Sequence, residues 1–202
     1  MMQAPPSQVR ALCPNGVTII ATFDDNGSPR GFTASSFSWL SLRPPRVAFL
    51  LARNASSHPA FATAEGFSVN VLRAEHETLA LRFATKGADK FCGGEFAYAD
   101  DSYPHLTDAL ATLQCRVSER VDCGDHMLVL GEVVDARVTP DAVPMVRYDN
   151  AFWPMNAVTR SSTADPGKSR PHTAVLSSLL RRSRRKSGRT TSTSTTSRGV
   201  ES

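Results

Sequence analysis

The sequence predicts a mainly β protein whose strands form an antiparallel barrel with short helices. Three observations support this prediction. Short runs rich in β-branched and aromatic residues recur through residues 1–153, and Gly, Pro and Asn turn signals separate them. Only short helical patterns lie between these runs, which disfavours a parallel sheet built from β-α-β units. Beyond Trp153 the chain has no Phe, Trp or Tyr, so we expect the folded domain to end at residue 153.

The first half of this domain has the patterns of strands and one helix. The sequences GVTIIATFDD and GFTASSFSWLSL flank the turn sequence NGSP, and they predict a hairpin over residues 17–42. The continuous apolar run RVAFLLAR, residues 46–53, predicts a buried strand. A short helix is expected to follow, with Ser57 as its N-cap and Pro59 near its first position.

The second half of the domain continues this pattern. GFSVNVLR, residues 66–73, predicts a strand, and AEHETLALRFA, residues 74–84, predicts a helix with acidic residues in its first turn. The glycine-rich sequence KGADKFCGGEF predicts a loop. Residues 110–138 predict two long strands joined by an acidic turn, and residues 144–153 predict a last strand.

The charge is divided unevenly between the domain and the rest of the chain. Residues 1–159 contain 13 Lys and Arg and 17 Asp and Glu, a net charge of −4, whereas residues 160–202 contain 10 Lys and Arg and two acids, a net charge of +8. The low-complexity sequence RRSRRKSGRTTSTSTTSRG cannot bury a core, so residues 154–202 are expected to form a basic, disordered tail. The acidic domain gives no reason to expect nucleic acid as a partner.

Several kinds of site are disfavoured by the absence of their motifs. Neither a dinucleotide-binding GxGxxG, a P-loop nor a GxSxG elbow occurs. The five histidines show no paired metal-ligand spacing, so no metal is expected. The four cysteines show neither a metal spacing nor a disulfide framework and are expected to be free thiols in a reducing cytoplasm. No apolar segment predicts a signal peptide or a membrane span, so we expect a cytoplasmic protein without a membrane partner.

Three clusters of polar residues remain as candidate ligand contacts: Thr33, Ser35 and Ser36 in a strand; Asn54, Ser56 and Ser57 after the buried strand; and Lys86 and Lys90 in the glycine-rich loop. Hydroxyls near a helix N-terminus favour a phosphate, and a loop lysine can close over an anion. Together they suit a ligand with a flat polar head and one phosphate. Taken singly, each is also what ordinary strands and loops contain.

His126 begins one of the two long predicted strands, after a turn. An isolated histidine there is most simply a surface residue with a satisfied hydrogen bond. Asp125 precedes it directly, but neighbouring strand residues point to opposite faces, so the spacing does not predict an Asp–His pair.

In their order and spacing, five motifs resemble the flavin reductase-like family, the small reductases of two-component flavin monooxygenases. They are GFTASSF, SLRPPRVAFLLAR, FSVNVLR, LALRFATKGADKFCGGEF and CGDHMLVLGEV. The likeness spans roughly residues 8–153 and is strongest to NADH:FMN reductases of the actinorhodin type. It implies a Greek-key-like, FMN-binding split β-barrel that acts as a homodimer. It also implies hydride transfer from C4 of NADH to flavin N5, with reduced FMN, or FAD as the alternative, passed to a separate monooxygenase in antibiotic biosynthesis.

The resemblance also implies roles for individual residues. Residues 33–36 would line the isoalloxazine edge and the ribityl chain, residues 51–57 would run beside the flavin, and residues 88–91 would close its phosphate end. His126 would be the catalytic residue on the nicotinamide side, with Tyr148 nearby. The implied cofactor contacts are Thr33, Ala34, Ser35, Ser36, Leu51, Ala52, Arg53, Asn54, Ser56, Ser57, Ala88, Asp89, Lys90 and Phe91.

Three other functions fit parts of the sequence. A flavin-binding module without reductase activity needs the same FMN contacts. Another flavin oxidoreductase on the same barrel, such as a pyridoxamine-phosphate-oxidase-like protein, would need a more basic phosphate loop. RNA binding through the basic tail is disfavoured because the domain lacks an aromatic RNA-binding strand pattern.

Overall fold

The computed structural model describes residues 3–98 and 102–155. The chain divides into two units, Met1–Ala164 and Asp165–Ser202, and the second lies outside the described residues. The predicted disordered tail, residues 154–202, lies outside them from residue 156 onward and stays a prediction.

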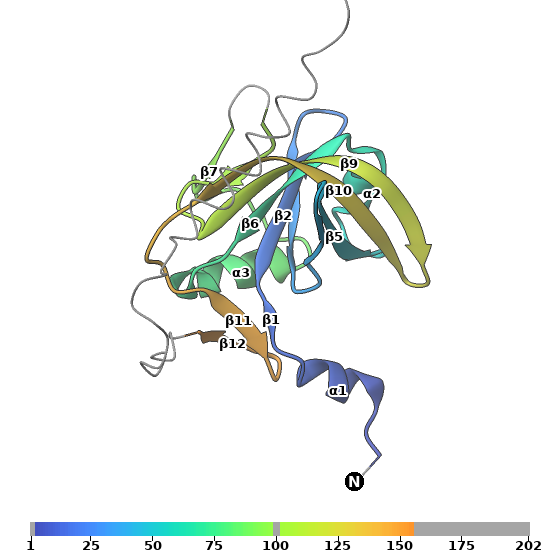
Figure 1. The fold of residues 1–202 in the computed structure, drawn as a ribbon, viewed down its shortest axis with the longest axis vertical. Coiled ribbons are helices and arrows are strands. Elements are labelled where there is room, and N and C mark those ends of the chain that lie inside the picture. The colour runs from blue at the N-terminus through green and yellow to red at the C-terminus, as the bar shows by residue number, and fades with distance from the viewer. Residues whose placement is uncertain (1–2, 99–101, 156–202) are drawn as a thin grey trace, which may run out of the picture. The chain divides into compact units, whose positions relative to one another are not determined.

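A curved, antiparallel seven-stranded sheet dominates the described part of the chain (Figure 1). Its order is β3-β2-β6-β9-β10-β5-β4. The strands are β2 (Thr18–Phe23), β3 (Pro29–Ala34), β4 (Ser38–Leu42), β5 (Pro45–Ala52), β6 (Gly66–Val71), β9 (Ala111–Cys123) and β10 (His126–Val138). The mainly β, antiparallel class predicted from the sequence is therefore confirmed, and β9 and β10 are the two long strands expected over residues 110–138.

The two edge strands of this sheet, β3 and β4, follow one another in the sequence, which brings the edges together. The chain between them contains Ser36, whose hydroxyl accepts a hydrogen bond from the Leu50 amide at 3.0 Å and donates one to the Leu50 carbonyl at 3.1 Å. The predicted hairpin over residues 17–42 is thus wrong in its second half. Strands β2 and β3 form a hairpin, but β4 pairs with β5 on the opposite edge. The sequence SSF, residues 35–37, forms this crossover between β3 and β4.

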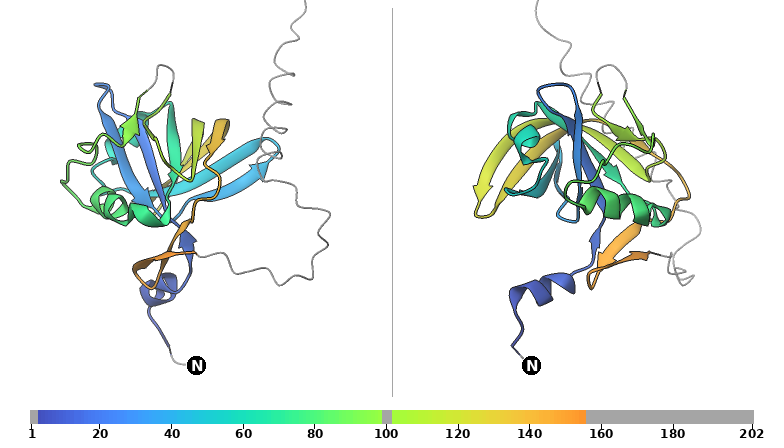
Figure 2. Two further views of the ribbon diagram at one scale, coloured as in Figure 1. Left: turned by 90° about the vertical axis from the view of Figure 1, so that its left-hand side faces the viewer. Right: turned by 180° about the vertical axis from the view of Figure 1, so that it is seen from behind.

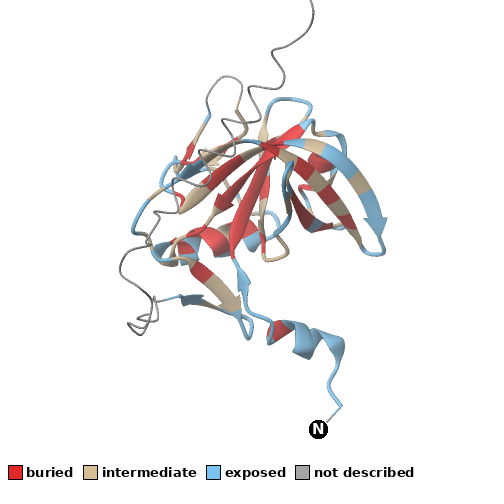
Figure 3. Cartoon of the chain, in the orientation of Figure 1, coloured by how far each residue is buried: buried red, intermediate tan, exposed pale blue. Residues whose placement is uncertain are grey.

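The barrel core is built from interlocking phenylalanine rings. Phe49, Phe61 and Phe67 are fully buried, and their rings meet edge to face at centroid distances of 5.6 Å (Phe49–Phe61) and 5.0 Å (Phe49–Phe67). Phe61 comes from the short helix α2 (His58–Thr63), which the sequence predicted after the buried strand. Figure 3 shows the buried residues gathered in the barrel strands, whereas the end of β9 and the turn that joins it to β10 are exposed.

A second apolar cluster attaches the remaining elements to the barrel. Phe83 on helix α3 (Glu77–Ala84) packs against Phe91 and Phe96, with ring centroids 4.9 and 5.2 Å away. A 3-10 turn, η1 (Ala74–His76), precedes α3, so the predicted helix over residues 74–84 is present in two parts. Phe96 lies in the two-stranded sheet of β7 (Phe96–Ala97) and β8 (His105–Leu106).

An arm extends from the barrel and consists of the N-terminal and C-terminal elements (Figure 2). It contains α1 (Pro6–Ala11), β1 (Asn15–Gly16), β11 (Met145–Tyr148) and β12 (Ala151–Pro154). Met145 is buried in the second cluster and anchors the arm. The last strand predicted over residues 144–153 is instead a hairpin, because Asp149 and Asn150 take positive φ angles of 48° and 60° and turn the chain.

Candidate functional site

A cavity of about 930 Å³ opens beside the crossover between β3 and β4, and its volume is in the range of cofactor sites. Most residues predicted to touch a flavin or NADH line it, although they come from separate strands and loops. They are Thr33, Ala34, Ser35, Ser36, Leu51, Ala52, Asn54, Ser56, Ser57, Lys90 and His126. A smaller adjoining cavity of about 270 Å³ is lined by Ser56, Ser57, Ala88, Asp89, Lys90 and Phe91.

The hydroxyl groups of residues 33–36 have different hydrogen-bond partners. Thr33 donates to the Ala80 carbonyl of α3 at 2.6 Å, so its hydroxyl holds the helix against the barrel. Ser36 is bound to the backbone of Leu50 in the crossover. Ser35 has no side-chain hydrogen bond within residues 3–98 and 102–155 and lines the cavity. Two of the three hydroxyls expected to face a ligand therefore also build the wall of the cavity.

The end of the cavity near α2 contains groups suited to a phosphate. The Ser57 side chain is buried, and its Oγ has no hydrogen-bond partner among the described residues. A buried hydroxyl without a partner is costly, and an incoming oxyanion would satisfy it. The Lys90 ammonium donates to the Gly31 carbonyl at 3.0 Å and lines both cavities. Burial lowers the pKa of Lys90, because an ammonium loses hydration there.

His126 forms a pair with Asp125, contrary to the expectation from strand alternation. The distance from His126 Nδ1 to Asp125 Oδ1 is 2.7 Å, and both residues line the cavity. Strand β10 begins at His126, so Asp125 lies in the preceding turn, where alternation does not apply. The hydrogen bond from His126 lowers the pKa of the Asp125 carboxyl. An ionised carboxylate only accepts, so Nδ1 carries the proton and Nε2 is left for a ligand.

Two predicted contacts lie outside both cavities. Arg53 pairs with Asp122 at 2.5 Å and donates to the Gly124 carbonyl at 3.1 Å, so its guanidinium fastens the β9–β10 turn. Tyr148 is 41% exposed at the end of β11, and its carbonyl accepts the Trp153 indole N–H. The neighbouring residue Arg147 lines the larger cavity instead.

The sequence reasoning did not identify four polar residues of the cavity: Arg10, Asn15, Asp125 and Arg147. Three of them belong to the arm, far in sequence from the five motifs, and only the pairing of β1 with β11 brings Asn15 and Arg147 together. Arg10, Asn15 and Arg147 stand in segments of mixed polarity, where a polar residue is too common to predict a site, and only Asp125 had a signal, its position next to His126.

The residues of the cavity fit a flavin that carries a phosphate. The partnerless Ser57 hydroxyl and the Lys90 ammonium match a phosphate, while Leu51, Ala52 and Phe32 supply apolar surface for a ring system. Within the described ranges, no group of three His, Cys, Asp or Glu side chains comes together as a metal site would require. No helix among these residues is long and apolar enough to span a membrane.

The chain matches the flavin reductase like domain over residues 9–155. It is 41% identical over 161 residues to the actinorhodin polyketide dimerase of Streptomyces coelicolor, covering 80% of this chain and 91% of that protein. It is 43% identical over 138 residues to the NADH:riboflavin 5'-phosphate oxidoreductase of Streptomyces pristinaespiralis, covering 67% and 78%. Other relatives are named as reductase subunits or components of flavin-dependent monooxygenases.

The fold is also shared with a solved structure, the NADH:FAD oxidoreductase SgcE6 of Streptomyces globisporus C-1027 in complex with NAD and FAD fragments. The TM-score is 0.73 at 29% identity, and the alignment covers 79% of this chain and 99% of that one. The family match spans the barrel, the arm from residue 9 onward and every residue of the cavity. The resemblance inferred from the five motifs is thereby confirmed, and the chain belongs to the flavin reductase-like family of oxidoreductases.

Proposed function

We propose that this chain is an NADH:FMN reductase that supplies reduced flavin to a separate monooxygenase. The observation that carries this proposal is the single cavity in which the hydroxyl-lined crossover, the Ser57 and Lys90 end and the Asp125–His126 pair meet. FMN is favoured over FAD because the partnerless Ser57 hydroxyl and Lys90 suit one terminal phosphate.

The roles of the residues follow from their positions. Ser56, Ser57 and Lys90 hold the phosphate, and residues 88–91 cover it from the glycine-rich loop. Residues 33–36, Leu51, Ala52 and Asn54 would lie along the flavin, where backbone N–H groups and the Ser35 hydroxyl stabilise negative charge. Bound flavin supplies the chemistry by accepting a hydride from C4 of NADH at its N5.

His126 is the residue we assign to the nicotinamide. Its Nδ1 proton is held by Asp125, so the ring presents Nε2 to the cavity as a hydrogen-bonding group. Hydride transfer needs the two rings to be stacked at roughly 3–3.5 Å. It does not need a strong acid or a nucleophile. His126 therefore acts by orienting the nicotinamide.

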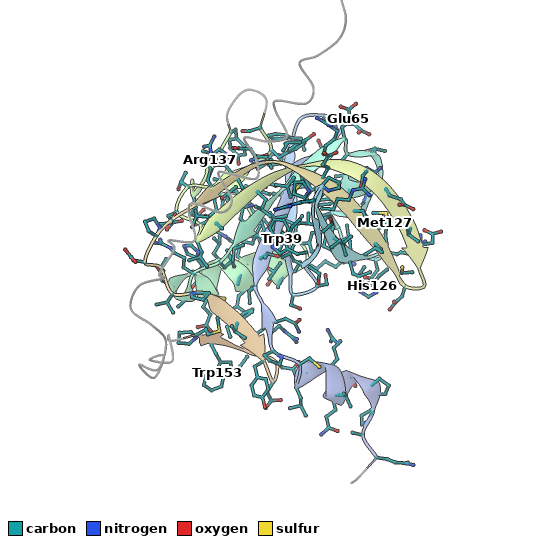
Figure 4. All side chains as sticks on the ribbon, in the orientation of Figure 1. Trp39, Glu65, His126, Met127, Arg137 and Trp153 are labelled. Carbon is teal, nitrogen blue, oxygen red and sulfur yellow. The ribbon has the colours of Figure 1, made fainter. Side chains whose placement is uncertain are left out.

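Exposed apolar side chains support a homodimer. Trp39, Leu40 and Leu42 are 42%, 52% and 58% exposed on β4, which is an edge strand with one unpaired side. Trp153 on β12 is also 54% exposed, and Figure 4 shows both tryptophan side chains. We also propose a cytoplasmic location, because free and exposed Cys13, Cys92 and Cys123 suit a reducing compartment.

The test is NADH oxidation by the purified full chain in air, followed by absorbance with no flavin, with FMN and with FAD. We expect oxidation that depends on added flavin and a lower KM for FMN than for FAD. Absence of flavin-dependent oxidation, combined with measurable FMN binding, would identify a flavin-binding module rather than a reductase. A lower KM for FAD would overturn the assignment of FMN alone.

A further inference from the structure

The larger cavity has a cationic lining although the domain around it is acidic. Residues 1–159 have a net charge of −4, yet four cationic side chains and one carboxylate line the cavity among the described residues. That carboxylate belongs to Asp125 and is hydrogen-bonded to His126. The flavin proposed above carries one phosphate, and Lys86 and Lys90 of the glycine-rich loop suffice for it. Two arginines, Arg10 and Arg147, remain without an assigned role.

Both arginines are positioned by the arm. Asn15 and Arg147 are directly opposed in the antiparallel pairing of β1 with β11, so their side chains lie on the same face of the small sheet. The Asp149 amide donates to the Ala11 carbonyl at 2.8 Å, which ties the end of α1, and therefore Arg10, to the β11–β12 turn. Figure 4 shows His126 at the start of β10, on the side of the barrel from which the arm extends.

The guanidinium groups are available for a ligand. Within residues 3–98 and 102–155, neither Arg10 nor Arg147 pairs with a carboxylate, although five other arginines do. Arg147 instead donates to the Asn150 side-chain oxygen at 2.8 Å, which orients the guanidinium without neutralising its charge. A planar guanidinium offers paired N–H donors that match phosphate oxygens.

We propose that Arg10, Asn15 and Arg147 form a second anion subsite that binds the diphosphate of NADH, and that the arm thereby sets the affinity for the dinucleotide. This inference rests on the proposed function, because NADH shares the cavity with the flavin. Arg10, Asn15 and Arg147 line only the larger cavity, whereas Ser57 and Lys90 also line the smaller one, so the two ligands of the reaction would each have their own phosphate contacts. The flavin is held by the barrel and the dinucleotide by the arm.

The test compares a hydride donor that carries phosphates with one that does not. Arg147→Gln is expected to raise the KM for NADH roughly tenfold, the lower end for a hydrogen bond to a charged group at a partly exposed site. The rate with 1-benzyl-1,4-dihydronicotinamide, which has the reacting ring but no phosphate, should be unchanged. The FMN dissociation constant should also be unchanged. Arg147→Lys, which keeps the charge, should recover part of the NADH affinity.

Two controls test whether the effect is specific to Arg147 and to binding. Arg137→Gln removes an arginine from an exposed position on β10 outside both cavities, so it matches the charge change and should leave the KM for NADH unchanged. Titration calorimetry of NAD⁺ into the FMN-loaded protein measures binding without turnover, and Arg147→Gln should weaken it by the same factor. Arg10→Gln, on the exposed α1 helix, repeats the test if Arg147→Gln folds poorly.

Three outcomes would overturn the subsite. These are an unchanged KM for NADH in both glutamine variants, an equal loss with the phosphate-free donor, and a loss confined to flavin binding, which would assign the arginines to the flavin. Failure of the wild-type chain to oxidise NADH would instead refute the proposed function, and the NAD⁺ titration would still decide whether the arm binds the dinucleotide.

Discussion

Replacing Lys90 by methionine tests the phosphate end of the cavity. Lys90 lines both cavities, and its ammonium donates to the Gly31 carbonyl at 3.0 Å. Methionine keeps the unbranched apolar stem and removes only the charge and its donors. We therefore expect weaker FMN binding with little effect on the fold.

The expected loss of affinity follows from the partly buried position of Lys90. A charged pair 4 Å apart near a protein surface attracts by about 4 kcal/mol at an effective dielectric constant of 20. Solvent competes for the ammonium, and the Gly31 carbonyl already accepts a hydrogen bond from it, so the net value is that of one charge-assisted hydrogen bond, about 1.5–3 kcal/mol. This corresponds to an FMN dissociation constant roughly 10- to 100-fold higher.

The assay is FMN titration followed by flavin fluorescence, with Lys86→Met as the matched control. Lys86 belongs to the same loop and lines the larger cavity, but it is exposed and lies outside the smaller one, so its loss should cost less affinity. Equal FMN affinity in the Lys90→Met variant and the wild type would refute the assignment of the phosphate end. A larger effect of Lys86→Met would move the phosphate to that lysine.

The lowered pKa of Lys90 predicts that Lys90→Met, although it weakens FMN binding, does not destabilise the flavin-free protein. Burial holds the folded-state pKa below its ordinary value, so the charged ammonium destabilises the flavin-free fold. This cost is fully present below the folded-state pKa and disappears as the pH rises towards the unfolded-state pKa. Lys90→Met should therefore be at least as stable as the wild type in urea at pH 7 without flavin. Clear destabilisation would show that the Gly31 contact outweighs desolvation.

Three further predictions concern other parts of the chain. Asp125→Asn should lower kcat/KM for NADH, because an amide does not fix the proton on Nδ1 of His126 as a carboxylate does. His126→Ala should raise the KM for NADH more than the KM for FMN. Unchanged NADH kinetics in both variants would remove the pair from the site. Phe49→Ala should lower the free energy of unfolding by about 3–5 kcal/mol in urea, whereas the exposed control Leu81→Ala should change it by less than about 0.5 kcal/mol; similar losses would contradict the assigned core. Deletion of residues 160–202, which lie beyond the family match, should leave FMN-dependent NADH oxidation intact, and an inactive truncation would give the tail a role.

The fold class could be predicted because local patterns carry it. The continuous apolar run became β5, and the two long alternating segments became β9 and β10, since burial of apolar residues at these periods dictates a strand. The crossover at Ser36 could not be predicted from local pattern. Threonine, serine and phenylalanine favour extended backbone on either side of it, and only the contact with Leu50 shows where β3 ends and β4 begins.

The residues of the candidate site also fall into two groups, those that the sequence predicts and those that only the structure identifies. Residues near the motifs, such as Ser57, Lys90 and His126, could be named from the sequence because the resemblance covers them. Strand alternation does not predict the Asp125–His126 pair, because β10 begins at His126 and Asp125 lies in the turn before it. The resemblance implies Arg53 as a contact because it falls within residues 51–57, but its guanidinium forms an ion pair with Asp122 outside both cavities.

Local patterns and motifs along the chain are enough to predict the β architecture, the family and the set of hydroxyl and lysine groups from which a flavin site is built. Which of these groups are free to bind depends on tertiary contacts. Thr33 and Ser36 use their hydroxyls to hold the wall, whereas Ser57 keeps a buried hydroxyl without a partner among the described residues. Only the structure brought Arg10 and Arg147 to the same cavity as His126. The reason is physical: hydrogen-bond partners and shared cavities depend on contacts between residues far apart in the chain, which local patterns of polarity do not encode.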